Sequence, residues 1–222
     1  MMLKNIMTAE RDSMEDVRIF LRSRGKVTLL LTAMNLLVFF VLDSFGDTQN
    51  AEFMLQYGAM YAPAVLENRE YYRLVTCMFL HFGIEHLFGN MLLLIFLGDL
   101  LEKIAGKWRY LLIYFVGGAA GNLLSLAKNV YTDNYVVSAG ASGALFAVLG
   151  ALVFLVIRYR GKIPGIPGER LVFMVLLTLA DGFFQEGVDH MAHLGGMAAG
   201  LVLAILLMGN MRLKRVPEFP EE

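Results

Sequence analysis

The sequence predicts an all-α integral membrane protein with six transmembrane helices and both termini in the cytoplasm. Of its 222 residues, 57% are hydrophobic and 18% are charged, and the mean hydropathy is +0.58. This composition is too apolar for an ordinary soluble domain of this length. The charged residues also fall between long apolar runs, and lysine and arginine gather in every second interval. These three observations define the fold class.

The apolar runs give the predicted helices in order. Four runs contain no charged side chain and approach the ~20 residues that cross a hydrocarbon core. The second run carries two histidines, a glutamate and an asparagine, and the fifth is short and interrupted by Asp181 and Gly182. In chain order the predicted helices cover residues 27–42, 80–101, 110–127, 134–157, 171–184 and 190–211.

The basic residues orient these helices. All but three of the 19 lysine and arginine residues lie before the first helix, after the second, after the fourth or after the sixth. The exceptions are Arg69, Arg73 and Lys128. By the positive-inside rule the termini are cytoplasmic, and the even-numbered helices enter from the outer face. The predicted domains are a cytoplasmic segment 1–26, a membrane domain 27–211 and a cytoplasmic tail 212–222.

Composition also limits which partners and which cellular location are expected. A net charge of −1 gives no reason to expect nucleic acid, and the single Cys77 rules out an intramolecular disulfide. The lipid bilayer is the expected surroundings. A short chain with six spans and no targeting extension favours a bacterial plasma membrane. Nothing in the sequence sets the oligomeric state.

Four polar side chains are predicted to share one depth in the membrane. Ser142 lies a few residues into the fourth predicted helix, His86 and Asn90 in the outer half of the second, and His193 a few residues into the sixth. All three helices start from the outer face. At ~1.5 Å rise per residue, these side chains lie roughly 5 to 15 Å below the outer surface.

Stripes of small residues predict that the fourth and sixth helices touch. In a bilayer, such stripes allow the backbones of two helices to approach closely. His193 lies on the face of one stripe, and Ser142 lies beside the head of the other. The stripes are Gly143, Ala147 and Ala151 on the fourth helix and Gly196, Gly200 and Ala204 on the sixth.

A hydroxyl and an imidazole at one helix crossing form a candidate nucleophile and general base. Attack of Ser142 on an amide carbonyl would create a negative oxygen that needs hydrogen-bond donors. His86 and Asn90, at i and i+4 on one helical face, qualify, as does the Ser142 backbone N–H. Gly140 is expected to allow a tight entry into the helix, and Gly143 to keep bulk away from the substrate.

Three motifs in this order resemble the signatures of the rhomboid intramembrane serine proteases. They are RLVTCMFLHFGIEHLFGNM, GASG and AHLGGMAAG, and the resemblance covers about residues 56–208. It implies a six-helix rhomboid-like bundle that cleaves single-span or other transmembrane substrates near their outer ends. It also implies Ser142 as nucleophile, His193 as base, and His86 and Asn90 as oxyanion partners. Phe146 stands where many members carry a tyrosine that packs beneath the catalytic histidine.

Other readings of the same residues compete with this one. A lone serine in a transmembrane helix more often packs or bonds back to its own helix, and His86 and Asn90 can serve as glue between helices. HFGIEH lacks the spacing of H-E-x-x-H, so no metal and no cofactor are expected, although Asp189, His190 and His193 form a possible chelating group.

The strongest rival is a catalytically inactive rhomboid-like protein that binds membrane clients. Ser142 and His193 are both present and GASG contains no proline, which favours activity. The sequence leaves open whether Asp189 or Glu85 contributes; we expect a dyad without a required carboxylate, because Asp189 lies one turn from His193 in an awkward direction.

Overall fold

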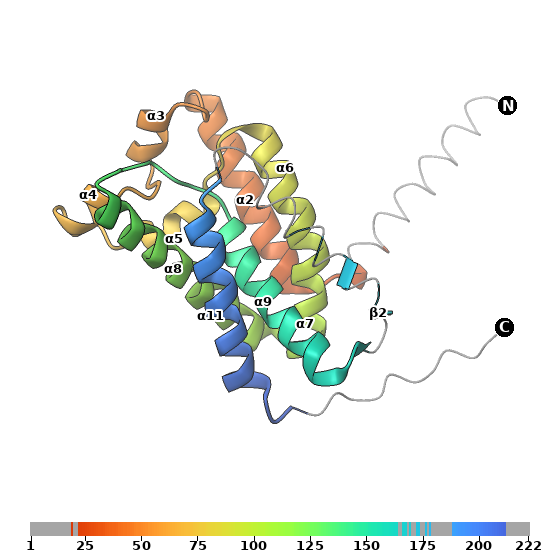
Figure 1. Cartoon of the computed structure of the whole chain (residues 1–222). Coiled ribbons are helices and arrows are strands. Elements are labelled where there is room, and N and C mark those ends of the chain that lie inside the picture. The colour runs from red at the N-terminus through yellow and green to blue at the C-terminus, as the bar shows by residue number, and fades with distance from the viewer. Residues whose placement is uncertain are drawn as a thin grey trace, which may run out of the picture.

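The computed structural model describes residues 19, 22–163, 166–167, 169, 172–173, 176, 178 and 188–211. These residues are helical apart from a two-residue antiparallel strand pair and connecting segments (Figure 1). In chain order the elements are α2 (Lys26–Phe45), α3 (Ala51–Gln56), α4 (Ala62–Leu66), α5 (Arg73–Thr76), η1 (Cys77–Phe79), α6 (Gly83–Leu93), η2 (Leu94–Gly98), α7 (Asp99–Ala105), α8 (Lys107–Thr132), α9 (Ser142–Tyr159), β1 (Lys162–Ile163), β2 (Ile166–Pro167) and α11 (His190–Met208).

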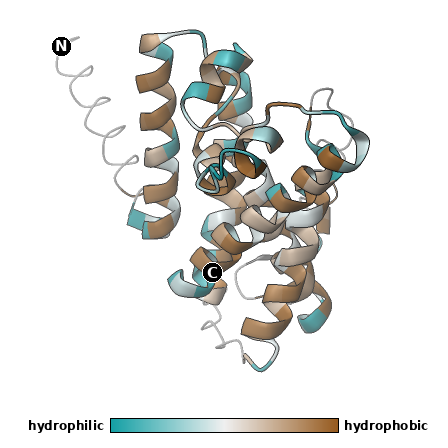
Figure 2. Cartoon of the chain, turned by 90° about the vertical axis from the view of Figure 1, so that its left-hand side faces the viewer, coloured by the Kyte–Doolittle hydropathy of each residue, from teal (hydrophilic) through white to brown (hydrophobic). Residues whose placement is uncertain are grey.

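Five helical segments of the described residues are long and apolar enough to cross a membrane. They are Lys26–Phe45, Gly83–Ala105, Lys107–Thr132, Ser142–Tyr159 and His190–Met208. The second joins α6, the π-helical turn η2 and α7 into one span. Hydrophobic residues follow the lengths of the helices, and hydrophilic residues gather at their ends (Figure 2). The protein is therefore an integral membrane protein, while the predicted helix 171–184 falls almost entirely outside the described residues.

The centre of the bundle is the packing of α8, α9 and α11, which lie side by side in Figure 1. A methyl group added to Gly196 would lie 2.1 Å from the carbonyl oxygen of Gly143, and one added to Gly200 would lie 1.9 Å from that of Ala147. The backbones of α9 and α11 thus touch directly, as the small-residue stripes predict.

Carboxylates of α7 hold the start of α2. Glu102 accepts hydrogen bonds from the backbone N–H groups of Val27 and Thr28, at 3.0 and 2.8 Å, and Asp99 accepts one from Gly25 at 2.7 Å. The first N–H groups of a helix have no acceptor within it. The side chains of α7 therefore cap α2, because its N-cap residue, Gly25, has no side chain that could do so.

The segment between α2 and α6 folds into the short helices α3 to α5 around a buried arginine. Arg73 donates hydrogen bonds to the carbonyl oxygens of Leu55 and Ala59, at 2.8 and 2.7 Å, and forms an ion pair with Glu70. The arginine cross-links this segment, because one guanidinium group carries several donors at fixed angles.

The fourth predicted helix begins eight residues later than expected, at Ser142 rather than Asn134. Ser138 forms an antiparallel bridge with Met60, and Gly140 has a φ of +141° and donates its N–H to the carbonyl oxygen of Cys77 at 2.9 Å. These tertiary bonds hold the segment out of helical conformation. Ser142 is consequently the first residue of its helix and not, as predicted, a few residues inside it.

The α9–α11 contact predicts the effect of a single methyl group. Gly200→Ala should lower the free energy of unfolding by about 1–3 kcal/mol, because the new methyl would overlap the Ala147 carbonyl. Gly89→Ala is the matched control, since nothing lies within 4 Å of its added methyl group. The measurement is the midpoint of thermal unfolding in detergent; equal midpoints for the two variants would contradict the described packing.

Candidate active site

Ser142 lies at the head of α9, where the backbone offers free donors. The first backbone bond into this helix runs from Leu145 N–H to the carbonyl oxygen of Ala141, at 3.0 Å. The N–H groups of Ser142, Gly143 and Ala144 precede it and have no acceptor in the helix. The half-buried Ser142 side chain therefore sits among backbone groups suited to an anion.

His81 fixes the peptide group just before this helix. Its Nε2 accepts the Ala141 N–H at 3.5 Å, and its ring packs edge-on against that of His86, with centroids 5.2 Å apart. Burial, with the neighbouring His86, lowers the pKa of His81 to about 3. The ring is neutral at physiological pH and can act as an acceptor.

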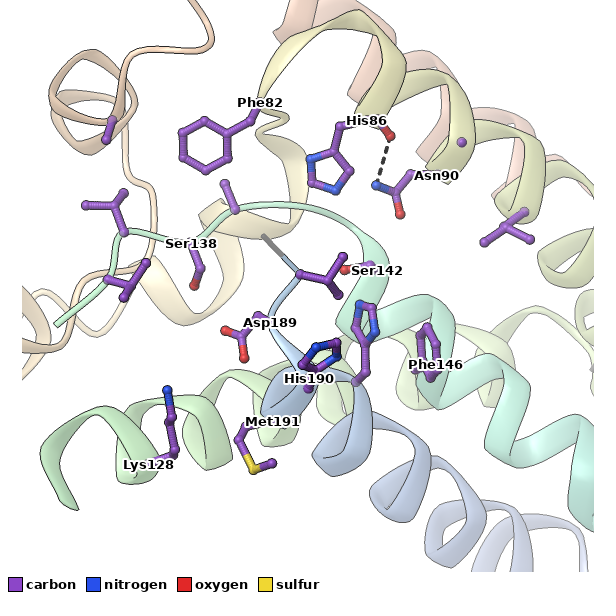
Figure 3. A pocket seen from close by; sticks show the side chains of 18 of the residues that line it. Phe82, His86, Asn90, Lys128, Ser138, Ser142, Phe146, Asp189, His190 and Met191 are labelled. Atoms are coloured by element: carbon purple, nitrogen blue, oxygen red, sulfur yellow. Dashed lines mark hydrogen bonds between the residues drawn. The ribbon is translucent and has the colours of Figure 1, made fainter. Parts of the chain in front are cut away.

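His86 and Asn90 reach the cavity from α6 (Figure 3). A methyl group added to Gly140 would lie 2.8 Å from His86 Cε1 and 3.7 Å from Ser142 Oγ. Gly140 therefore lies next to both the His86 imidazole and the Ser142 hydroxyl. The buried Asn90 amide donates to the His86 carbonyl oxygen at 3.0 Å, which leaves its second N–H available.

His193, only 5% exposed, is held by ring packing on α9. Its imidazole stacks on Phe146, with centroids 4.0 Å apart and planes 11° apart. The ring that replaces the family tyrosine thus keeps the packing position beneath the histidine, without a hydroxyl. This flat contact joins α11 to α9 beside the cavity that His193 lines.

Asp189 caps α11. One carboxylate oxygen accepts the Ala192 N–H at 3.0 Å, and the other accepts the Ser125 hydroxyl on α8. Both oxygens are therefore engaged with groups other than an imidazole. Within the described part of the chain, no cluster of histidine, cysteine or acidic residues could hold a metal ion, and His190 is exposed.

One cavity of about 850 Å³ joins these residues. Ser142, His193, His86 and Asn90 all line it, as do Phe146 and Asp189. The walls come from α6, α8, α9 and α11 and from the extended segment before α9 (Figure 3). Glu85 and Lys128 also line the cavity. Lys128 belongs to none of the three sequence motifs, although a lysine in a segment depleted of basic residues is a signal.

Known proteins have sequences similar to this chain. The family model described as "Rhomboid domain" matches residues 68–210. The chain is 31% identical to the rhomboid protease GluP of Bacillus subtilis over 92% of this chain and 39% of that protein. It is 29% identical to the putative rhomboid protease YdcA of the same bacterium over 86% of this chain and 93% of that protein. RHOMBOID-like protein 1 of Arabidopsis thaliana is 37% identical over 68% of this chain and 38% of that protein. The chain thus spans about two fifths of the length of GluP and of the plant relative.

The cap of α11 predicts how Asp189 variants behave. Asp189→Ala should lower the free energy of unfolding by about 1 kcal/mol, because the Ala192 N–H loses its acceptor. Asp189→Asn keeps a capping oxygen and should lose less. Thermal unfolding in detergent separates the two variants, and an asparagine variant as unstable as the alanine one would argue against the capping role.

Proposed function

This chain belongs to the rhomboid family, and from that premise we propose that it is an intramembrane serine endopeptidase with a Ser142–His193 dyad. One observation carries the proposal. Side chains from three helices that are far apart in the sequence line a single cavity, and they comprise a nucleophile, a base and two hydrogen-bond donors. Two of the relatives are named as rhomboid proteases, one of them putative.

In the proposed mechanism, His193 takes the proton of Ser142 Oγ as this oxygen attacks the scissile carbonyl carbon. The carbonyl oxygen becomes negative in the tetrahedral intermediate. His193 then gives its proton to the leaving amine, and the peptide C–N bond breaks to leave an acyl-serine. A water molecule, deprotonated by His193, attacks the ester, and the proton returns to Ser142 as the acid product leaves.

The oxyanion would be stabilised by donors already in position. The Ser142 backbone N–H lies at a helix N-terminus, where the helix dipole also favours negative charge. The free N–H of the Asn90 amide and a ring N–H of His86 add side-chain donors. His81 supports this arrangement by accepting the N–H of Ala141, the residue directly before Ser142.

The proposed topology follows from the distribution of basic residues. We place the site end of the bundle at the outer face, with six helices, both termini in the cytoplasm and the bounds 1–26, 27–211 and 212–222. A bacterial plasma membrane is the proposed location. The substrates are single-span or other transmembrane proteins cut near their outer ends, where a helix must unwind because its carbonyls are otherwise bonded within it.

Substitution of either dyad residue should abolish proteolysis. Purified protein in liposomes should cleave a single-span model substrate, whereas Ser142→Ala and His193→Ala should lower kcat by at least about 10³-fold. Activity should survive chelators and Asp189→Asn, since in the proposed mechanism neither a metal nor a carboxylate as third catalytic residue takes part. A native protein that cleaves no such substrate and fails to react with a fluorophosphonate probe would instead be an inactive protein that binds membrane clients.

Loss of the oxyanion donors should lower kcat more than it changes KM. His86→Ala and Asn90→Ala each remove a donor needed chiefly in the transition state, and we expect a drop of about 10 to 10³-fold in kcat. Steady-state cleavage in detergent gives both constants. A rise in KM at constant kcat would assign these residues to substrate binding.

A further inference from the structure

Lys128 is a charged side chain in the cavity for which the dyad chemistry has no use. It lies near the end of α8, is exposed, and lines the cavity that also contains Ser142. Its ammonium group makes no hydrogen bond or ion pair with any other residue described by the structure. Figure 3 shows it beyond Asp189, on the far side of the cavity from His86 and Asn90.

The charges around this lysine leave it free to bind a ligand. The Asp189 carboxylate is engaged by Ala192 N–H and the Ser125 hydroxyl. Glu85, the second carboxylate among the described lining residues, is on α6 and forms no ion pair with them. Among the described lining residues, the cavity therefore has one lysine, on α8, and two carboxylates, of which Asp189 is already hydrogen-bonded.

The position of Lys128 is unusual for its side of the membrane. The predicted outer segments hold three basic residues, and Arg73 is buried against Glu70 and backbone carbonyls. Arg69 is outside the cavity. Lys128 is thus the basic residue of these three that faces the site. A substrate inserted by the same positive-inside rule has few basic residues in its outer flank, so its charged residues there are mainly acidic.

We propose that Lys128 is a specificity-determining residue that pairs with an aspartate or glutamate in the outer juxtamembrane segment of the substrate. This inference rests on the proposed protease function. The pair would form at the mouth of the cavity while the scissile bond lies at Ser142. Because the lysine is exposed, the effect on cleavage is modest and sensitive to salt.

A charge-swap experiment tests the pairing. One single-span substrate is made with Glu, Gln or Lys at a juxtamembrane position outside the scissile bond, scanned over successive positions. At one or more positions the native protein should cleave the Glu form about two- to fivefold faster than the Gln form in kcat/KM, and the Lys form most slowly. Lys128→Glu should reverse this order, and Lys128→Gln should remove it.

The controls separate this pairing from general charge effects. Arg69→Glu makes the same change of charge on the same side of the protein but away from the cavity, and it should keep the native order. Rates are normalised to fluorophosphonate labelling of Ser142, which reports a folded dyad. Raising the ionic strength should shrink the native preference.

The outcomes distinguish the two proposals. Two results would overturn the role of Lys128 and leave the protease proposal standing. One is a kcat/KM that does not depend on substrate charge at any position, and the other is an order of the three substrates that Lys128→Glu leaves unchanged. A native protein that cleaves none of the substrates and resists the probe would overturn the protease proposal and this inference with it.

Discussion

The direct contact between the backbones of α9 and α11 is the constraint on which the site depends. In a bilayer, apolar side chains gain little by leaving lipid for protein, so helices associate through close van der Waals contact. Gly196 and Gly200 provide this contact because their α-carbons lie against the carbonyl oxygens of Gly143 and Ala147. Ser142 directly precedes the first of these carbonyls. The way the two helices pack therefore also sets the position of Ser142 relative to His193.

Hydrogen bonds of polar side chains at the helix ends also hold the helices in place. Asp189 caps α11 and ties it to Ser125 of α8, while Glu102 caps α2 from α7. At the end of the bundle opposite the site, Arg109 donates to the carbonyl oxygen of Leu207 near the end of α11, at 3.1 Å. An unpaired backbone group at membrane depth is costly. The bonds of Glu102 and Arg109 thus join two helices at backbone groups that lack a partner in their own helix.

The histidine of the proposed dyad stacks on an aromatic ring of α9. The Phe146 ring lies flat on His193, and the carboxylate nearest in the sequence is used as a helix cap. Near His86, His81 accepts the N–H of Ala141, and Gly140 leaves room for the His86 ring. A rigid scaffold of rings and glycines can hold a reactive geometry in a membrane without adding buried charge, which hydrocarbon surroundings penalise.

The sequence by itself determined the membrane class, five of the spans, the small-residue contact of α9 with α11, and the four polar residues that meet in one cavity. These features follow from composition, from the spacing of residues within single helices and from three short motifs. Only the tertiary structure decided that α9 begins at Ser142, because a bridge to Met60 and the bond from Gly140 to Cys77 hold the preceding residues extended. It also decided the acceptor role of His81 and the position of Lys128. These depend on which distant segments come into contact, and no local pattern records that.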